Sequence, residues 1–90
     1  MSLPYKKIEK IVKGFANHRR LQILELLSRV PNLSVDDISQ NLDVGFFTIS
    51  DHIRKATDAG LIEKKYKGRF VLHSLTKRGR HILLFCKMFK

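Results

Sequence analysis

The sequence predicts a small α+β fold that is mostly helical, with four helices, a two-stranded β-hairpin and a last helix. Apolar residues recur at helical spacing through residues 8–56 and again from residue 82, whereas residues 61–74 have the short apolar runs and the Gly-containing turn of a hairpin. The 90 residues, 43% of them hydrophobic, suffice for one small core and not for two. We therefore expect a single domain over residues 1–90.

Two helices are predicted first. One carries lysines opposite an apolar face made of Ile8, Ile11, Val12 and Phe15. Asn17 is a favourable N-cap for the next helix, which has only a narrow polar strip and ends before Pro31. A helix with so little polar surface is expected at the centre of the core.

Two shorter helices follow. Ser34 with Asp37 three residues later resembles a capping box, and it begins a third helix that runs to Leu42. The break at residues 43–45 leads to a fourth helix, which is expected to end near Gly60. Its inner stripe consists of Ile49, Ile53 and Ala56. Two short helices joined by a tight turn form a helix-turn-helix arrangement.

From residue 61 the spacing of the apolar residues changes from that of helices to that of strands. Residues 61–65 and 69–74 flank Tyr66-Lys67-Gly68 and predict a basic β-hairpin, a wing beside the helix-turn-helix. Thr76 caps a last helix whose apolar residues wrap most of its circumference: Ile82, Leu83, Leu84, Phe85, Cys86, Met88 and Phe89. A domain this small cannot cover that helix alone, so the terminal helices are expected to dimerise. The predicted fold is a winged helix-turn-helix.

The charge of the chain is strongly positive and uneven. Its 18 Lys and Arg against 8 Asp and Glu give a formal charge of +10 and a pI near 10.2. Residues 1–45 carry 7 basic and 5 acidic side chains (+2), whereas residues 46–90 carry 11 and 3 (+8). This imbalance indicates a polyanionic partner that binds mainly the second half, although a solvated basic surface is the alternative. Charge alone does not choose between DNA, RNA and an anionic membrane.

Several other classes of protein are disfavoured: disulfide-linked, metal-binding, catalytic and membrane proteins. The single Cys86 allows neither an internal disulfide nor a Cys-pair metal site. The four histidines, at 18, 52, 73 and 81, share no i,i+4 pairing, so we expect no metal, with a site assembled between subunits as the open alternative. We also expect no catalytic residues and no cofactor. No apolar run is long enough for a membrane span or a secretory signal, so a cytoplasmic protein without a membrane partner is expected.

Several segments resemble the ArsR and MarR families of winged-helix transcriptional regulators. Ile11 to Leu27 (IVKGFANHRRLQILELL) resembles the ArsR-type opening, and Leu42 to Ile62 (LDVGFFTISDHIRKATDAGLI) resembles the recognition-helix segment. Ser74-Leu75-Thr76 with Gly79-Arg80 resembles the end of the wing in many MarR-like proteins. The resemblance implies a homodimer that binds a palindromic operator in double-stranded DNA and usually represses a promoter. The fourth helix would enter the major groove.

The chain departs from the families at the first turn of the recognition helix, where Gly45-Phe46-Phe47 is apolar, and at Asp51. Arg54 can fork onto guanine, contact phosphate or pair with a neighbouring aspartate. Phe47 can pack on a thymine methyl or belong to the core or a protein contact, whereas Phe46 is expected nearer the core. The candidate DNA-binding residues are Arg20, Phe47, Thr48, Ser50, Asp51, Arg54, Lys55, Lys64, Lys65, Lys67 and Arg69.

The dimer interface is expected on the apolar faces of the first and last helices. Its candidate residues are Ile8, Ile11, Phe15, Ile82, Leu83, Phe85, Cys86 and Phe89. Two alternatives to a dimeric regulator stay open: a protein-interaction module that docks through Phe46 and Phe47, and a protein that binds DNA or RNA without sequence preference. The sequence points to no particular small-molecule effector.

Overall fold

The computed structural model of the chain describes residues 2–90 and begins with two helices. Helix α1 spans Tyr5–Phe15 and α2 spans His18–Arg29. The side chain of Asn17 accepts hydrogen bonds from the backbone N–H groups of Arg19 and Arg20, at 2.9 and 3.3 Å, which confirms Asn17 as the N-cap. Four residues of α2 are buried: Ile23, Leu24, Leu26 and Leu27. The predicted central position of α2 is therefore confirmed.

The next two helices form the predicted helix-turn-helix. Helix α3 spans Val35–Leu42 and α4 spans Phe46–Asp58. The Ser34 hydroxyl accepts from the Asp37 N–H and an Asp37 carboxylate oxygen accepts from the Ser34 N–H, both at 3.1 Å, so the capping box is complete. Asp43 adopts a left-handed conformation (φ 54°) in the turn, and the Ser39 hydroxyl donates to the Val44 carbonyl across it. The helix pair is thus fixed by local hydrogen bonds.

The hairpin consists of strand β1, Ile62–Lys67, and strand β2, Phe70–Leu75. Their antiparallel register sets Ile62 opposite Leu75 and Lys67 opposite Phe70. The turn is therefore Gly68-Arg69 and not the predicted Tyr66-Lys67-Gly68, because the ladder continues through Lys67 and only Gly68 needs a positive φ, 62°.

The α2–α3 linker joins the base of the hairpin. Leu33 forms an isolated antiparallel bridge with His73, through N···O distances of 2.8 and 3.2 Å. The His73 side chain is buried, and its Nδ1 lies 2.9 Å from the Leu33 carbonyl oxygen. These contacts attach the wing to the helical body on the edge of β2.

The chain ends in helix α5, Lys77–Cys86, followed by one 3₁₀ turn, Lys87–Phe89. The Thr76 hydroxyl accepts from the Gly79 N–H at 3.0 Å, which confirms the predicted cap. A Cβ on Gly79 would collide with the Leu61 carbonyl, so a glycine lets α5 start directly against the residue before β1. The predicted last helix is helical through Phe89, but its final turn tightens to 3₁₀.

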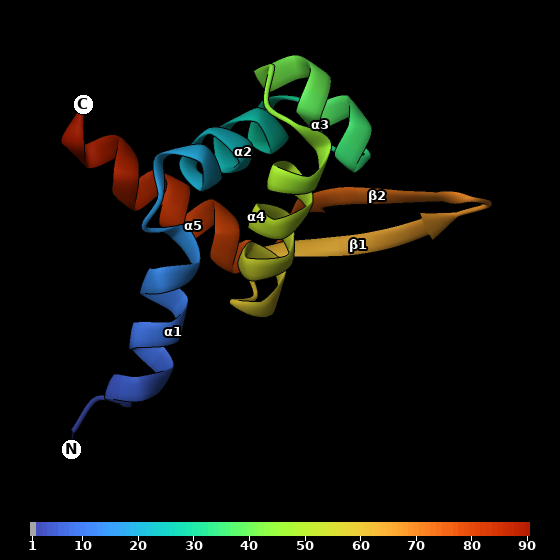
Figure 1. Cartoon of the computed structure of the whole chain (residues 1–90). Coiled ribbons are helices and arrows are strands. Elements are labelled where there is room, and N and C mark those ends of the chain that lie inside the picture. The colour runs from blue at the N-terminus through green and yellow to red at the C-terminus, as the bar shows by residue number, and fades with distance from the viewer. Residues whose placement is uncertain (1) are drawn as a thin grey trace.

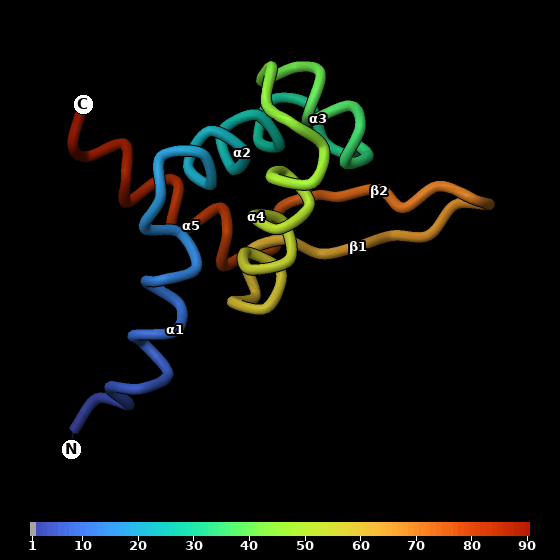
Figure 2. Tube along the Cα trace, viewed as in Figure 1, coloured from blue at the N-terminus to red at the C-terminus, as the bar shows by residue number. Residues whose placement is uncertain are grey.

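The elements form a helical body from which the hairpin projects. In Figure 1 the hairpin extends to one side, whereas α1 and the end of α5 lie on the other. The Cα trace in Figure 2 shows both termini remote from the hairpin tip. The principal extents are 45 × 30 × 21 Å, long for a chain of this size because these elements reach outward. In the part of the chain described, we find no helix with the length and apolarity needed to cross a membrane.

Candidate nucleic-acid interface

The exposed side of α4 begins with two aromatic residues. Phe47 is 86% exposed, which excludes its placement in the core. Phe46, expected nearer the core, is still 46% exposed and meets Phe47 edge to face, with ring centroids 5.5 Å apart. Phe46 also borders a groove of about 470 Å³ toward Arg69 and Phe70 of the hairpin. The first turn of α4 therefore presents an apolar surface to solvent.

Charged side chains pair along the next two turns of α4. Arg54 Nη2 lies 2.6 Å from Asp51 Oδ1, and Lys55 Nζ lies 3.1 Å from Asp51 Oδ2. Arg54 Nη1 is 3.9 Å from an Asp58 oxygen. The hydrogen bonds from Arg54 and then Lys55 hold the pKa of Asp51 below its usual value. Asp51 thus positions the two cations, and because exposed pairs contribute little free energy, a DNA group can compete for them.

Thr48 and Ser50 complete the candidate residues of α4. Thr48 is exposed in the first turn and Ser50 is half-buried in the second. Both hydroxyls therefore lie at the end of the helix that carries Phe47. This end has no acidic residue in its first turn, so the partial positive charge of the helix N-terminus is not neutralised there.

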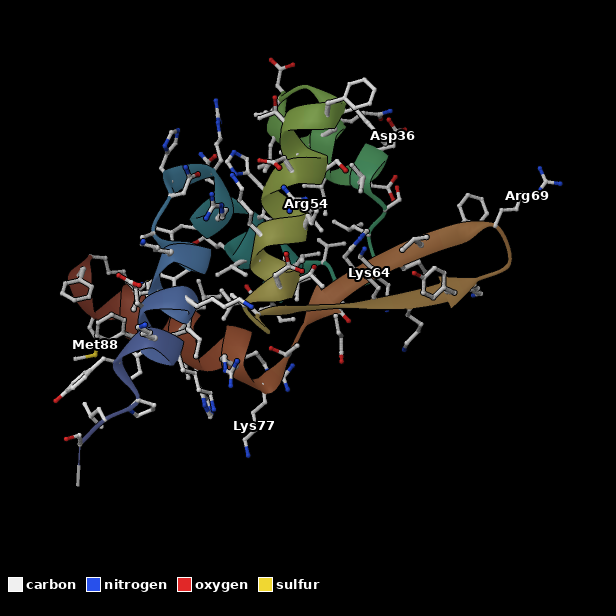
Figure 3. The ribbon with its side chains drawn as sticks, turned by 60° about the horizontal axis from the view of Figure 1, so that its bottom comes forward. Asp36, Arg54, Lys64, Arg69, Lys77 and Met88 are labelled. Atoms are coloured by element: carbon white, nitrogen blue, oxygen red, sulfur yellow. The ribbon has the colours of Figure 1, made fainter. Side chains whose placement is uncertain are left out.

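The hairpin, which packs against α4 through β1, carries four candidate cations. All four are exposed: Lys64, Lys65, Lys67 and Arg69. Because side chains alternate between the faces of a strand, Lys65 and Lys67 share one face and Lys64 lies on the other. Figure 3 shows Arg69 at the hairpin tip and Lys64 nearer its base. The wing therefore presents positive charge from its base to its tip.

Arg20, a candidate phosphate contact, is held by hydrogen bonds within the helical body. Its Nε donates to His52 Nδ1 at 3.2 Å and its Nη1 donates to the Lys13 carbonyl at 2.5 Å. Burial, followed by the Arg20 charge, lowers the pKa of His52, so its Nδ1 is available as an acceptor at neutral pH. Arg20 thereby connects α1, α2 and α4. Lys10 and Lys13 line the same pocket as Arg20. The sequence did not predict them as site residues, because their spacing does not show that α1 packs on α4.

The candidate dimer residues divide into two groups. Ile8, Phe85 and Phe89 are exposed, whereas Ile11, Phe15, Ile82 and Cys86 are half-buried. Leu83 is only 7% exposed and belongs to the core that α5 forms with α2, so it offers little surface to a second subunit. Two other apolar residues near the C-terminus, Leu84 and Met88, are also exposed.

Burial raises the pKa of the Cys86 thiol, so the thiol is protonated at neutral pH. Figure 3 places Met88 at the end of the molecule opposite Arg69. Within residues 2–90, no three His, Cys, Asp or Glu side chains lie close enough together to hold a metal ion.

Comparison with known proteins identifies the family. The model of the bacterial regulatory protein arsR family matches residues 17–64, more than half of the chain. A search of curated proteins gave no match. HlyU from Vibrio cholerae is 26% identical, with a TM-score of 0.82 over 99% of this chain and 97% of that protein.

Two further solved structures share the fold. The homodimeric winged helix-turn-helix DNA-binding domain of Mycobacterium bovis is 22% identical, with a TM-score of 0.86 over 94% of this chain and 79% of that one. Streptococcus pneumoniae FabT in complex with DNA is 25% identical, with a TM-score of 0.71 over 78% of this chain and 51% of that one. Family and fold are those of transcriptional regulators and not of enzymes. With its helix-turn-helix inside the matched segment, the chain belongs to the ArsR family of DNA-binding transcriptional regulators.

Proposed function

We propose that this regulator is a homodimer that represses transcription by occupying a palindromic operator. The observation that carries the proposal is the exposed outer side of α4 beside a hairpin with four exposed cations. A helix of this size fits the major groove, and cations beside it suit the backbone phosphates.

In this proposal the residues of α4 read bases and the hairpin anchors the backbone. Arg54 and Phe47 are exposed on α4, where a guanidinium can reach guanine and a ring can pack on a thymine methyl. Lys65, Lys67 and Arg69 belong to the hairpin, which projects from the helical body (Figure 1) to where the flanking backbone or minor groove would lie. The FabT structure, solved with DNA, supports this use of a similar fold.

The dimer is inferred from apolar surface remote from the hairpin. Phe85, Met88 and Phe89 are exposed at the C-terminal end, and the Phe85 and Phe89 rings pack edge to face with centroids 5.2 Å apart. Tyr5 and Ile8 of α1 add further exposed apolar surface. Exposed apolar side chains gathered in this way commonly mark a protein interface. The homodimeric M. bovis domain, which has the same fold, supports the inference.

Selection of bound duplexes from a random DNA pool tests the proposal. We expect enrichment of an inverted repeat whose half-sites are about one helical turn apart, ~10 bp, because a two-fold dimer presents two recognition helices. A scrambled duplex and an RNA of equal length are the controls, and both should bind more weakly. Enrichment of a single unpaired half-site would contradict the palindrome, and equal affinity for the three ligands would contradict sequence-specific binding.

Transcription in vitro from a promoter that contains the selected site tests repression. Added protein should reduce the transcript from this promoter and leave a promoter with the scrambled site unchanged. An increase in the transcript would show an activator instead.

A further inference from the structure

A basic cleft lies where α1, α2 and α4 meet. Its volume is about 350 Å³, and its lining consists of Lys10, Lys13, Gly14, Arg20, Lys55 and Asp58. Both α1 and the hairpin pack against α4, and Figure 1 shows them on opposite sides of it. The cleft is therefore a second concentration of positive charge beside the recognition helix, separate from the wing.

A close helix contact forms the floor of this cleft. Gly14 is buried, and a Cβ there would collide with the Cβ of Ala59, so only glycine lets α1 approach the end of α4 this closely. A Cβ at position 14 would also lie 3.7 Å from the Lys55 carbonyl oxygen. This approach brings Lys10 and Lys13 of α1 to the same opening as Lys55, more than forty residues later in the sequence.

Arg20 is held in place at the wall of the cleft. Its bonds to His52 Nδ1 and to the Lys13 carbonyl come from two different nitrogens, Nε and Nη1. A guanidinium has five N–H donors, so this fixed group retains donors for an anion. An arginine that is already ordered loses less conformational entropy when it binds a phosphate than a free surface side chain does.

Nearby carboxylates do not cancel the positive charge of the cleft. Asp58 is in the lining, and Glu9 and Asp51 lie 3.8 and 3.1 Å from Lys13 and Lys55. Four cations therefore face three carboxylates, and the Glu9 and Asp51 pairs are exposed, where such interactions are weak.

We propose that this cleft binds a phosphate group, which on the operator is a phosphodiester of the DNA backbone. The inference rests on the proposed function for the source of the phosphate, but not for the site itself. Because α4 separates the cleft from the hairpin, the two would hold the backbone at opposite borders of the major groove that α4 enters. A free phosphorylated molecule offers the same chemistry, so the experiment has one arm for each source.

The first arm compares two double variants with equal loss of charge. Lys10→Gln with Lys13→Gln removes two cleft cations, and Lys6→Gln with Lys7→Gln removes two exposed lysines of the same helix that do not line the cleft. The salt dependence of binding to duplex DNA is measured for both. The slope of the logarithm of the binding constant against the logarithm of the salt concentration should become less steep by about 1 for each phosphate that the cleft variant no longer neutralises. In the control it should change by clearly less. Equal slopes in the two variants would overturn the assignment to the DNA backbone.

The second arm needs no DNA. Pyrophosphate is titrated into the ¹⁵N-labelled protein, and the amide signals of Gly14, Arg20 and Lys55 are followed. They should shift in the wild type and in the control variant, and stay in place in the cleft variant. If they do not shift in the wild type, the phosphate site is overturned. If they shift but the wild type binds no duplex, the proposed function fails while the cleft stands as a site for a free phosphorylated molecule.

Discussion

At the scale of single residues, Phe47 is the most exposed large hydrophobic side chain among residues 2–90. Phe47→Ala should change the free energy of unfolding by no more than ~0.5 kcal/mol, because no cavity forms at so exposed a position. It should instead weaken the preference for thymine at one position of the selected site, since no ring then packs on the methyl group while the phosphate anchors remain. Thermal unfolding and sequence selection on the same variant check both outcomes. Unchanged sequence preference would remove Phe47 from the recognition surface.

Arg54 is the second residue whose role can be separated by experiment. If its guanidinium donates two hydrogen bonds to one guanine, Arg54→Ala should reduce the binding free energy by about 1–3 kcal/mol at one base pair and by little elsewhere. Arg54→Lys should not restore this preference, because an ammonium cannot form the paired hydrogen bonds. Affinities for a panel of single-base variants of the site provide the measurement. A uniform loss over the whole panel, rescued by lysine, would assign Arg54 to a phosphate.

At the scale of elements, the hairpin is expected to anchor the protein without selecting sequence. Replacing Lys65, Lys67 and Arg69 together by alanine should weaken binding to all duplexes, because their cations release counterions from phosphates. The salt slope should flatten by about 1 for each phosphate that is no longer neutralised. Alanine at Lys7 and Lys77, exposed on α1 and α5, is the charge-loss control and should have a smaller effect per lysine. A slope that the triple variant leaves unchanged would remove the hairpin from the interface.

The joint between the hairpin and the α2–α3 linker is expected to weaken in acid. Burial lowers the pKa of His73, whose Nδ1 faces the Leu33 carbonyl. As the pH falls below the ordinary histidine pKa of about 6.5, the unfolded chain binds a proton that the folded chain resists, so the free energy of unfolding decreases. His52, whose pKa is also lowered, contributes with the same sign.

Denaturant unfolding at pH 7.5 and 5.5 measures this effect. His73→Gln should reduce the loss of stability between the two pH values, whereas the same change at the exposed His81 should leave that loss as in the wild type. An unaltered pH dependence in the His73 variant would show that the buried imidazole does not set it.

At the scale of the whole molecule, the proposed function assigns the two ends different partners: the hairpin and α4 would contact DNA, and the terminal helices would contact a second copy. Phe85→Asp should dissociate the dimer, because it buries an unpaired charge in an apolar interface, and operator affinity should fall with it as the second recognition helix is lost. Phe70→Asp, at an exposed aromatic on the hairpin, is the matched control and should leave the dimer intact. Sedimentation at micromolar concentration measures both, and an undissociated Phe85 variant would move the interface elsewhere.

The order of the elements could be predicted from the sequence because each depends on neighbours along the chain. Asn17, Ser34 and Thr76 cap helices through bonds to residues two or three positions away, and such bonds leave a signature in local spacing. The concentration of positive charge in the second half is likewise a property of composition. Thus the fold class, the recognition helix and the basic hairpin followed from the sequence alone.

Only the tertiary structure decided which surfaces are covered and which distant groups meet. Helical periodicity shows that α5 is apolar nearly all round, but only the packing of α2 buries Leu83 and leaves Phe85 exposed. The bonds from Arg20 to His52, 32 residues away, and from His73 to Leu33, 40 residues away, leave no trace in local spacing. The physical reason is that the periodicity of a helix or strand fixes the direction of each side chain, whereas the packing of whole elements decides which residue that side chain meets.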